Sequence, residues 1–278
     1  EQRLMQDTVK QFVRDRVTPH AEQWANDKAV PEQVLKEMGQ LGLMGMTTDP
    51  DWDGAGADYV SYALALMEVA AGDGGLSTIM SVNNAPMCAA MSQQGNDEQK
   101  ARFLAPMARG EMIGAFCLTE AHAGSDAAAI RTRAERDGDH YIIKGSKQFI
   151  TSGKIAGCAL IFAVTDASAG KRGLSAFIVP TDLDGYTVSK TEEKLGQASS
   201  DTCALNFDNL RVHASCLLGE EGQGYRIALA NLETGRIGIA SQSVGMAQAA
   251  LDYAIAYACE RESMGVAIIE HQAVAFRL

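Results

Sequence analysis

The sequence lacks any clustered run of lysine and arginine, and its acidic residues outnumber its basic ones. Its 278 residues contain 35 Asp and Glu against 24 Lys and Arg, for a formal net charge of −11. Binding to nucleic acid requires a concentrated positive surface that neutralises phosphates, so we expect no nucleic acid partner. The sequence also has no apolar run near the roughly 20 residues that cross a bilayer. We therefore expect no membrane insertion.

Spacings typical of metal sites and of nucleophilic serines are also missing. The Gly219–Gly224 stretch does not follow the Gly-x-Gly-x-x-Gly order of a dinucleotide loop. Ser125 does not lie in a Gly-x-Ser-x-Gly turn, which argues against a hydrolase. The cysteines show no paired spacing, so we predict neither a metal centre nor disulfides, but buried thiols in a reducing compartment; these residues are Cys88, Cys117, Cys158, Cys203, Cys216 and Cys259.

The first part of the chain has the periodicity of helices. Apolar residues recur at helical spacing over four segments, which are 4–17, 31–42, 59–71 and 76–91. Asn96 precedes two acidic residues and is typical of a helix N-cap. We predict an N-terminal helical domain over residues 1–112.

The middle of the chain changes to short β-prone runs. Asp137-Gly138 predicts a tight hairpin, and the expected strands are 132–134, 141–143, 149–151, 158–164, 174–179, 186–188 and 202–207. We predict a middle antiparallel β-domain, a barrel or sandwich, over 113–224. Helical periodicity then returns, so 225–278 is expected to begin a C-terminal helical domain that is incomplete here. The predicted fold class is α+β with several domains.

A polar, glycine-containing stretch lies where the helices give way to strands, Phe116–Asp126 (FCLTEAHAGSD). Gly124 permits close approach of the backbone to a ligand. Thr119 and Ser125 offer hydroxyl and N–H groups to a ring carbonyl or to phosphate oxygens. An ordinary polar turn with satisfied local hydrogen bonds would use the same residues, so the residues alone leave both interpretations open.

This stretch resembles a pattern of the acyl-CoA dehydrogenase family: a hydrophobic residue, Ser or Thr, Glu, two variable residues, a small residue, Gly, Ser or Thr, and Asp. Further segments resemble the same family in the same order along the whole chain. They are the second flavin segment Lys147–Thr151 (KQFIT), the substrate-binding helix at Asn231–Arg236 (NLETGR), and the elements Arg261–Gly265 (RESMG) and Glu270–Gln272 (EHQ). Met264 departs from the Phe that is usual in the family.

The resemblance implies FAD as the cofactor. The cofactor-binding residues that it implies are Phe116, Leu118, Thr119, Gly124, Ser125, Phe149, Ile150, Thr151, Arg261 and Gln272. It places Phe149 against the isoalloxazine ring and the Thr151 hydroxyl on flavin N5, which accepts the hydride. Arg261 and Gln272 are expected to reach FAD phosphates or adenosine across a subunit interface of a homo-oligomer, a dimer of dimers. Without the resemblance, Phe149 would be read as core, Thr151 as an ordinary strand residue and Arg261 as a solvated charge.

The implied reaction is the α,β-dehydrogenation of a short-chain acyl-CoA to a trans-2-enoyl-CoA. A base removes the α-proton while the β-hydrogen leaves as hydride, and the electrons pass to an electron-transferring flavoprotein. Residues 80–84 resemble the short-chain branch of the family, in a helix that closes the acyl pocket. An acyl-CoA oxidase and a catalytically inactive flavin- or acyl-CoA-binding homologue are the alternatives. A bacterial protein would be cytoplasmic and a eukaryotic one would lie in the mitochondrial matrix, with any targeting segment not visible.

The resemblance assigns substrate binding to Ser125, Glu233 and Arg236, and leaves the catalytic base unknown. Some relatives carry the catalytic Glu immediately before the Arg, where this chain has Gly235. Glu233 shares a helical face with Arg236 and could reach the pocket, but an acid there serves substrate binding in the family. Other relatives use a later Glu, so we expect the base to lie beyond Leu278 and the chain to be part of a longer enzyme.

Overall fold

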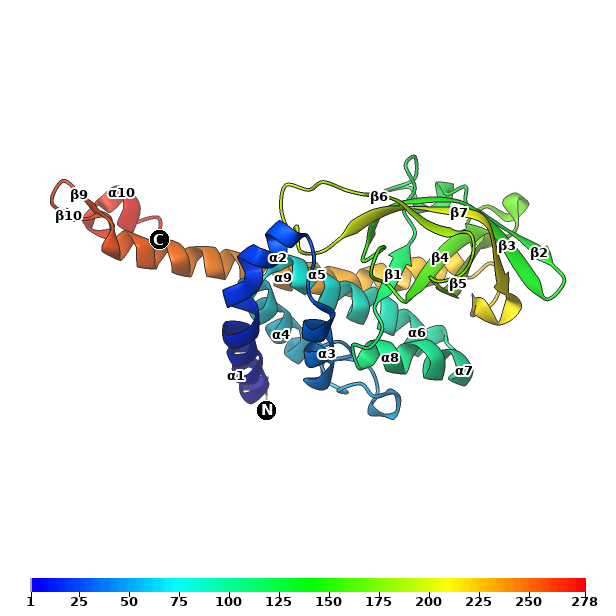
Figure 1. The fold of residues 1–278 in the computed structure, drawn as a ribbon, viewed down its shortest axis with the longest axis horizontal. Helices are drawn as coiled ribbons and strands as arrows, with labels where there is room; N and C mark the ends of the chain where they lie inside the picture. Colours follow the sequence, from blue (N-terminus) through cyan, green and yellow to red (C-terminus); the bar gives the residue numbers. More distant parts are fainter. Residues whose placement is uncertain (1) are drawn as a thin grey trace.

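The computed structural model describes residues 2–278, in which helices gather on one side and a β-sheet on the other, with one long helix running alongside both (Figure 1). The first part of the chain is helical, as predicted. Its α-helices are α1 (Gln2–Phe12), α2 (Ala21–Asp27), α3 (Glu32–Gln40), α4 (Tyr59–Gly72), α5 (Gly74–Val82), α6 (Ala89–Gln94), α7 (Asp97–Gln99) and α8 (Ala105–Ala108). Asn96 caps α7 through a capping box with Gln99, which confirms the predicted N-cap.

The helix expected over 76–91 is interrupted. Regular helix ends at Val82, and an irregular helical segment, Asn83–Cys88, separates α5 from α6. Within it Ala85 has φ −138° and ψ 110°, an extended conformation. Pro86 explains the interruption, because its ring disfavours helical geometry at the preceding residue and it has no N–H to donate. The prediction of one continuous helix was therefore wrong at this point.

The middle of the chain forms one eight-stranded mixed sheet. Its strands are β1 (Gly114–Cys117), β2 (Arg133–Asp137), β3 (His140–Thr151), β4 (Cys158–Val164), β5 (Leu174–Pro180), β6 (Tyr186–Thr191), β7 (Thr202–His213) and β8 (Leu217–Leu218). The order is β6-β7-β3-β2-β4-β5-β8, and β1 pairs with β4. Most pairings are antiparallel, as predicted, while β1 and β2 each run parallel to β4.

The predicted hairpin is confirmed, because Asp137 pairs with His140 across a two-residue turn in which Gly138 has φ +64°. The next strand differs from the prediction. Two expected runs, 141–143 and 149–151, belong to the single long strand β3. Its pairing with β7 shifts register twice, once between Ile143 and Gly145 and once between Lys147 and Ile150. These irregularities interrupt the alternation of buried and exposed side chains by which a strand is predicted from sequence.

The core continues from the helices into the sheet. Strands β4 and β5 are buried along nearly their whole length. Leu160 and Phe162 pack with side chains of α6 and α8 in one cluster, whereas Ala159 and Ile161 belong to a second cluster with β3 and β7. A third cluster lies within the N-terminal helices. Strands β4 and β5 are covered on both faces. They therefore hold β1, which pairs with β4, in place against the helices.

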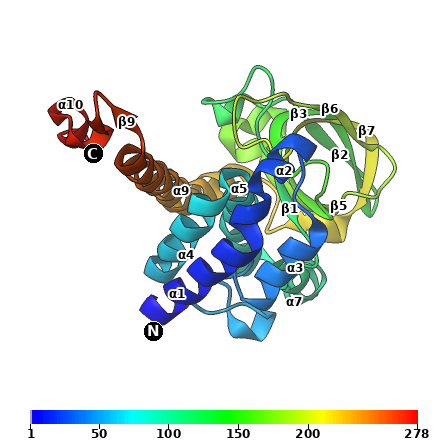
Figure 2. The same cartoon turned by 60° about the vertical axis from the view of Figure 1, so that its left-hand side comes forward.

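Helix α9 (Gly224–Glu260) begins where helical periodicity was expected to return, and it packs along α4 and α5. Close approach depends on two glycines. A Cβ at Gly238 would lie 2.4 Å from the Ser81 hydroxyl oxygen, and one at Gly245 would lie 2.2 Å from the Met67 carbonyl oxygen. Beyond this contact α9 projects away from the other elements (Figure 2). It is followed by the short elements β9 (Glu262–Ser263), β10 (Val266–Ala267) and α10 (Gln272–Ala275).

The domain boundaries at 112 and 224 stay a prediction. Five of the six cysteines are buried, as expected, and Cys259 is exposed. Among residues 2–278, no helix is both long and apolar enough to cross a membrane. No group of three or more potential metal-ligating side chains was found in the same described residues.

Candidate functional site

A cavity of about 680 Å³ opens where the helices meet the sheet. Its walls come from the α5 end and the irregular segment after it, from β1 and the loop that follows, from the end of β3, and from α9. The lining residues are Ser81, Val82, Ala85, Pro86, Phe116, Thr119, Phe149, Ile150, Thr151, Leu232, Gly235, Arg236, Ile239, Ala240 and Ser243. Its volume lies within the range typical of small-molecule sites, and apolar side chains predominate.

The sheet side of the cavity, the sheet wall, consists of Phe116, Thr119, Phe149, Ile150 and Thr151. Phe149 has φ +58° and is 60% exposed, although it lies inside a strand. A positive φ at a bulky residue is an outlier that surrounding structure must hold. The register shift between Lys147 and Ile150 provides it, so Phe149 turns out of the strand alternation and lines the cavity rather than entering the core.

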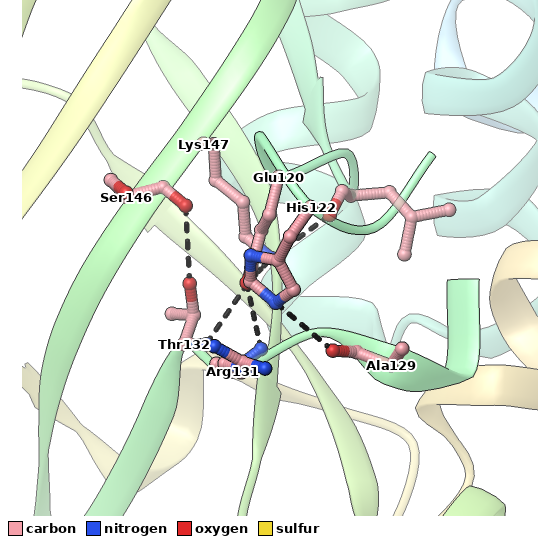
Figure 3. Close-up of polar contacts among 8 residues, drawn as sticks. Glu120, His122, Ala129, Arg131, Thr132, Ser146 and Lys147 are labelled. Atoms are coloured by element: carbon pink, nitrogen blue, oxygen red, sulfur yellow. Dashed lines mark hydrogen bonds and ion pairs between the residues drawn. The ribbon is translucent and has the colours of Figure 1, made fainter. Parts of the chain in front are cut away.

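The loop after β1 is tied to β3 beside Phe149. The Gln148 N–H donates to the Thr119 carbonyl at 2.9 Å, and Lys147 Nζ donates to the Leu118 carbonyl at 3.0 Å. Lys147 Nζ also lies 2.8 Å from Glu120 Oε1 (Figure 3). Thr119 lines the cavity, and in the described chain its hydroxyl and N–H donate to no protein acceptor. The Thr151 hydroxyl likewise has no hydrogen-bond partner among residues 2–278.

Burial and neighbouring charge shift the pKa of Glu120 in opposite directions. Its side chain is almost fully buried, which by itself raises the pKa of the carboxyl. The Lys147 charge, its hydrogen bond, and hydrogen bonds from Thr132 and Arg131 act in the other direction and hold this pKa below its ordinary value. Glu120 is therefore ionised at neutral pH and serves as a fixed acceptor behind the sheet wall.

The opposite side of the cavity, the helical wall, is one face of α9. Leu232, Arg236, Ile239, Ala240 and Ser243 recur at helical spacing, so they share this face. Arg236 forms no ion pair with a residue in the described part of the chain. Gly235 leaves room between Arg236 and the irregular segment, since a Cβ there would lie 3.7 Å from the Ala85 carbonyl oxygen, an ordinary contact.

Two buried asparagines fix the segment that closes the cavity between these walls. Asn84 Nδ2 donates to the Leu43 and Met80 carbonyls, and its Oδ1 accepts from the Met46 N–H at 2.6 Å. Asn83 Oδ1 accepts from the Gly114 N–H at 3.1 Å, which joins the segment to β1. Within the stretch 80–84, Ser81 and Val82 line the cavity, whereas the asparagines support the backbone.

The structure brings together six of the residues singled out from the sequence: Phe116, Thr119, Phe149, Ile150, Thr151 and Arg236. Six others do not line the cavity of the single chain: Leu118, Gly124, Ser125, Glu233, Arg261 and Gln272. Leu118 is buried in the core. Gly124 and Ser125 lie in an exposed turn on the sheet side. Arg261 follows the C-terminal end of α9 and Gln272 begins α10, at the projecting end of the molecule.

Sequence reasoning missed part of the lining. Leu232, Ile239, Ala240 and Ser243 were not assigned, although their helical spacing from Arg236 could have found them. Ala85 and Pro86 gave no such signal, because their position depends on the break in the helix. Among the described lining residues only Arg236 carries an ionisable side chain, and none is Asp, Glu or His.

The sheet wall fits a planar ring with polar edges. Phe116 and Phe149 supply aromatic surface, and Thr119 and Thr151 supply hydroxyls that protein groups leave unused. An isoalloxazine ring has apolar faces and a rim of nitrogen and carbonyl groups, so these residues could hold it without an unpaired charge. The helical wall offers a cation and an apolar face, which suits a polar ligand with a hydrocarbon tail.

Family models match almost the whole chain in three parts. The acyl-CoA dehydrogenase N-terminal domain matches residues 1–111, the middle domain 115–210 and the C-terminal domain 222–278. An acyl-CoA dehydrogenase of Bacillus subtilis (strain 168) is 43% identical over 278 residues, which cover 100% of this chain and 73% of that protein.

Two solved structures are also similar. Butyryl-CoA dehydrogenase from Megasphaera elsdenii superposes with a TM-score of 0.94 at 35% identity, covering 99% of this chain and 73% of that one. A glutaryl-CoA dehydrogenase from Mycobacterium smegmatis, in complex with FADH2, gives a TM-score of 0.93 at 37% identity over 99% and 70% of the two chains. With three matching domains in order and this degree of identity, the chain belongs to the acyl-CoA dehydrogenase family.

Proposed function

We propose that this chain is an FAD-dependent enzyme that oxidises a short-chain acyl-CoA to the trans-2-enoyl-CoA. One observation carries the proposal: both flavin segments implied by the sequence and Arg236 of α9 line the same cavity. The Mycobacterium smegmatis relative in complex with FADH2 supports the choice of cofactor. The Megasphaera elsdenii relative, a butyryl-CoA dehydrogenase, supports a short acyl chain.

Bound FAD would supply a hydride acceptor, and the residues of the sheet wall would hold it. Phe149 would pack against its ring. The Thr151 hydroxyl would be available as a donor to N5, and Thr119 would offer a hydroxyl and an N–H to the ring edge. Apolar neighbours on both walls exclude water and strengthen these hydrogen bonds.

The helical wall handles the acyl-CoA. Arg236 is the cation of the cavity and attracts a polar group of the thioester or pantetheine. Leu232 and Ile239 extend the apolar surface on its two sides, while Val82 and Pro86 face them from the closing segment. Glu233 is exposed and outside the lining, so in this proposal it contributes to substrate binding from outside the cavity and does not act as the base.

The proposal extends to partners and assembly. The family resemblance implies an electron-transferring flavoprotein as the electron acceptor and a homotetramer as the assembly. Arg261 follows α9 and Gln272 begins α10, beyond the cavity of their own chain, which supports a role for them at a neighbouring subunit. An oxidase is the second candidate, and it differs in letting oxygen reoxidise the reduced flavin.

The decisive experiment is anaerobic reduction of the FAD-loaded protein by a panel of acyl-CoAs from propionyl to palmitoyl, with branched chains included. We expect a yellow protein whose flavin band bleaches slowly, because no carboxylate lines the described cavity, and a higher kcat/KM for butyryl-CoA than for octanoyl-CoA. A protein that stays colourless after incubation with FAD contradicts the proposal. The reverse chain-length order contradicts the short-chain preference alone. Rapid reoxidation in air would favour the oxidase.

A further inference from the structure

An almost fully buried ion pair lies behind the sheet wall, and neither partner lines the cavity. None of the Lys147 side chain is exposed and 4% of the Glu120 side chain is, with 2.8 Å between Nζ and Oε1. Figure 3 shows Glu120 between Lys147 of β3 and the backbone of Arg131 and Thr132. Glu120 Oε2 accepts from the Arg131 N–H at 2.7 Å and Oε1 accepts from the Thr132 N–H at 3.0 Å. The carboxylate therefore links three segments of the chain.

Thr132 extends this link across the sheet. Its carbonyl accepts from the Val164 N–H at 2.8 Å, at the end of β4. Its hydroxyl donates to the Ser146 carbonyl at 3.4 Å, in β3 directly before Lys147. The backbone that Glu120 holds is thus also held by both neighbouring strands, which makes Glu120 a rigid anchor for Lys147.

Lys147 transmits this anchoring to the cavity. Its ammonium donates to the Leu118 carbonyl as well as to Glu120, and the next residue, Gln148, donates its N–H to the Thr119 carbonyl. Two consecutive carbonyls of the loop are thereby engaged by two consecutive residues of β3. Thr119 lies directly before Glu120, and Phe149 lies two residues after Lys147. Each partner of the ion pair is therefore within two residues of a lining side chain from a different segment.

Energetics argue against a role in stability alone. Burying two charges carries a large desolvation penalty, and well-packed apolar residues often replace such a pair without loss of stability. The buried pair is better explained by a need to hold the loop after β1 and strand β3 in one backbone arrangement. On the basis of the proposed FAD site, we propose that Lys147 and Glu120 are positioning residues that hold Thr119 and Phe149 in the register that binds the flavin ring.

The test separates flavin binding from folding in the double variant Glu120→Gln/Lys147→Met, which removes both charges and leaves no unpaired one. Three quantities are measured: the Tm of the apoprotein, the FAD Kd from quenching of flavin fluorescence, and the position of the bound-flavin absorption band. We expect the Tm to remain near that of the parent and the Kd to rise about tenfold or more, as for the loss of a charge-assisted hydrogen bond. The band should shift as well.

The matched control is Arg211→Met, which breaks the exposed ion pair of the same sheet between Arg211 Nη2 and Asp137 Oδ2, 3.3 Å apart. Arg211 lies opposite Ile142, at the end of β3 away from the cavity. It should leave the Kd and the band unchanged. A double variant that binds FAD with the parental Kd and band overturns the inference. If the double variant does not fold, Glu120→Gln/Lys147→Gln decides in the same way, because it also leaves no unpaired charge and its amides can still hydrogen-bond. A parent protein that fails to bind FAD would instead contradict the proposed function.

Discussion

The two walls of the cavity are built on different principles. The sheet wall has no ionisable lining residue, and its backbone is fixed by the Glu120–Lys147 pair, by the Gln148–Thr119 hydrogen bond and by the register shift at Phe149. The helical wall is a regular face of α9 that carries the cation Arg236 and, at Gly235, a position without a side chain. The sheet wall obtains its shape from strained and buried groups, whereas the helical wall obtains its shape from helical periodicity.

Under the proposed function, this difference gives the two walls separate roles. A planar cofactor that stays in place requires rigid donors, which the sheet wall provides. A substrate that enters and leaves requires a charge and an accessible apolar face, which α9 provides. We therefore expect substitutions in the helical wall to change acyl-CoA handling and substitutions in the sheet wall to change the flavin. The predictions below test this division.

The largest effect is expected from Gly235→Glu. A Cβ at this position would make only an ordinary contact of 3.7 Å with the Ala85 carbonyl oxygen, and the family resemblance implies that some relatives carry their catalytic Glu there. Because the described lining has no carboxylate, the variant should reduce bound flavin with butyryl-CoA faster by about 10²–10⁴-fold, the typical contribution of a general base. Stopped-flow absorbance measures the rate, and Gly235→Gln is the control. Equal rates in the two variants would show that the carboxylate does not reach the α-carbon.

A smaller effect is expected from Arg236→Ala. Loss of a hydrogen bond to a charged group should weaken acyl-CoA binding by about 10- to 100-fold, while the FAD Kd stays unchanged. Titration of the flavin spectrum with a non-reducing acyl-CoA analogue measures the first quantity, and fluorescence measures the second. Arg226→Ala, at an exposed arginine of the same helix outside the cavity, serves as the control. Release of FAD by Arg236→Ala would contradict the division of roles.

Thr151→Val should change the rate of flavin reduction more than the affinity for FAD. The change removes one hydroxyl donor without altering side-chain size much, so flavin reduction should slow by about 2- to 10-fold, equivalent to one net hydrogen bond. The flavin midpoint potential should shift with it. Thr187→Val, an exposed threonine of β6 outside the cavity, should change neither quantity. An unchanged potential in Thr151→Val would indicate that its hydroxyl does not face N5.

The smallest and most gradual effect concerns pH. The pKa of Glu120 is held below its ordinary value in the folded state, so its ionised form stabilises the fold above the unfolded pKa of about 4.3. That contribution is lost as pH falls through the folded pKa. The Tm difference between the parent and Glu120→Gln should therefore shrink on acidification below about pH 4.3. Calorimetry over this range measures the Tm difference. The variant His122→Gln controls for the neighbouring imidazole, whose Nε2 lies 3.6 Å from Glu120 Oε2. A Tm difference independent of pH would show that Glu120 gains nothing from ionisation.

Much of the fold could be predicted from local sequence signals. Helical periodicity identified α4 and the core of α9, the Asp137-Gly138 turn identified the β2–β3 hairpin, and Asn96 identified the start of α7. These features depend on residues close together in the chain, and their physical causes act locally. The family resemblance then supplied six residues that line the cavity.

Other features depended on contacts between distant segments. Only tertiary structure decided that Phe149 leaves the strand alternation, because its positive φ depends on the pairing of β3 with β7. It also decided that Lys147, 27 residues from Glu120 in sequence, is buried against it. The sequence by itself determined the order of helices, strands and helix and the chemical types of the lining residues. The tertiary structure decided which of them share one cavity, since burial and long-range hydrogen bonding are properties of the packed chain.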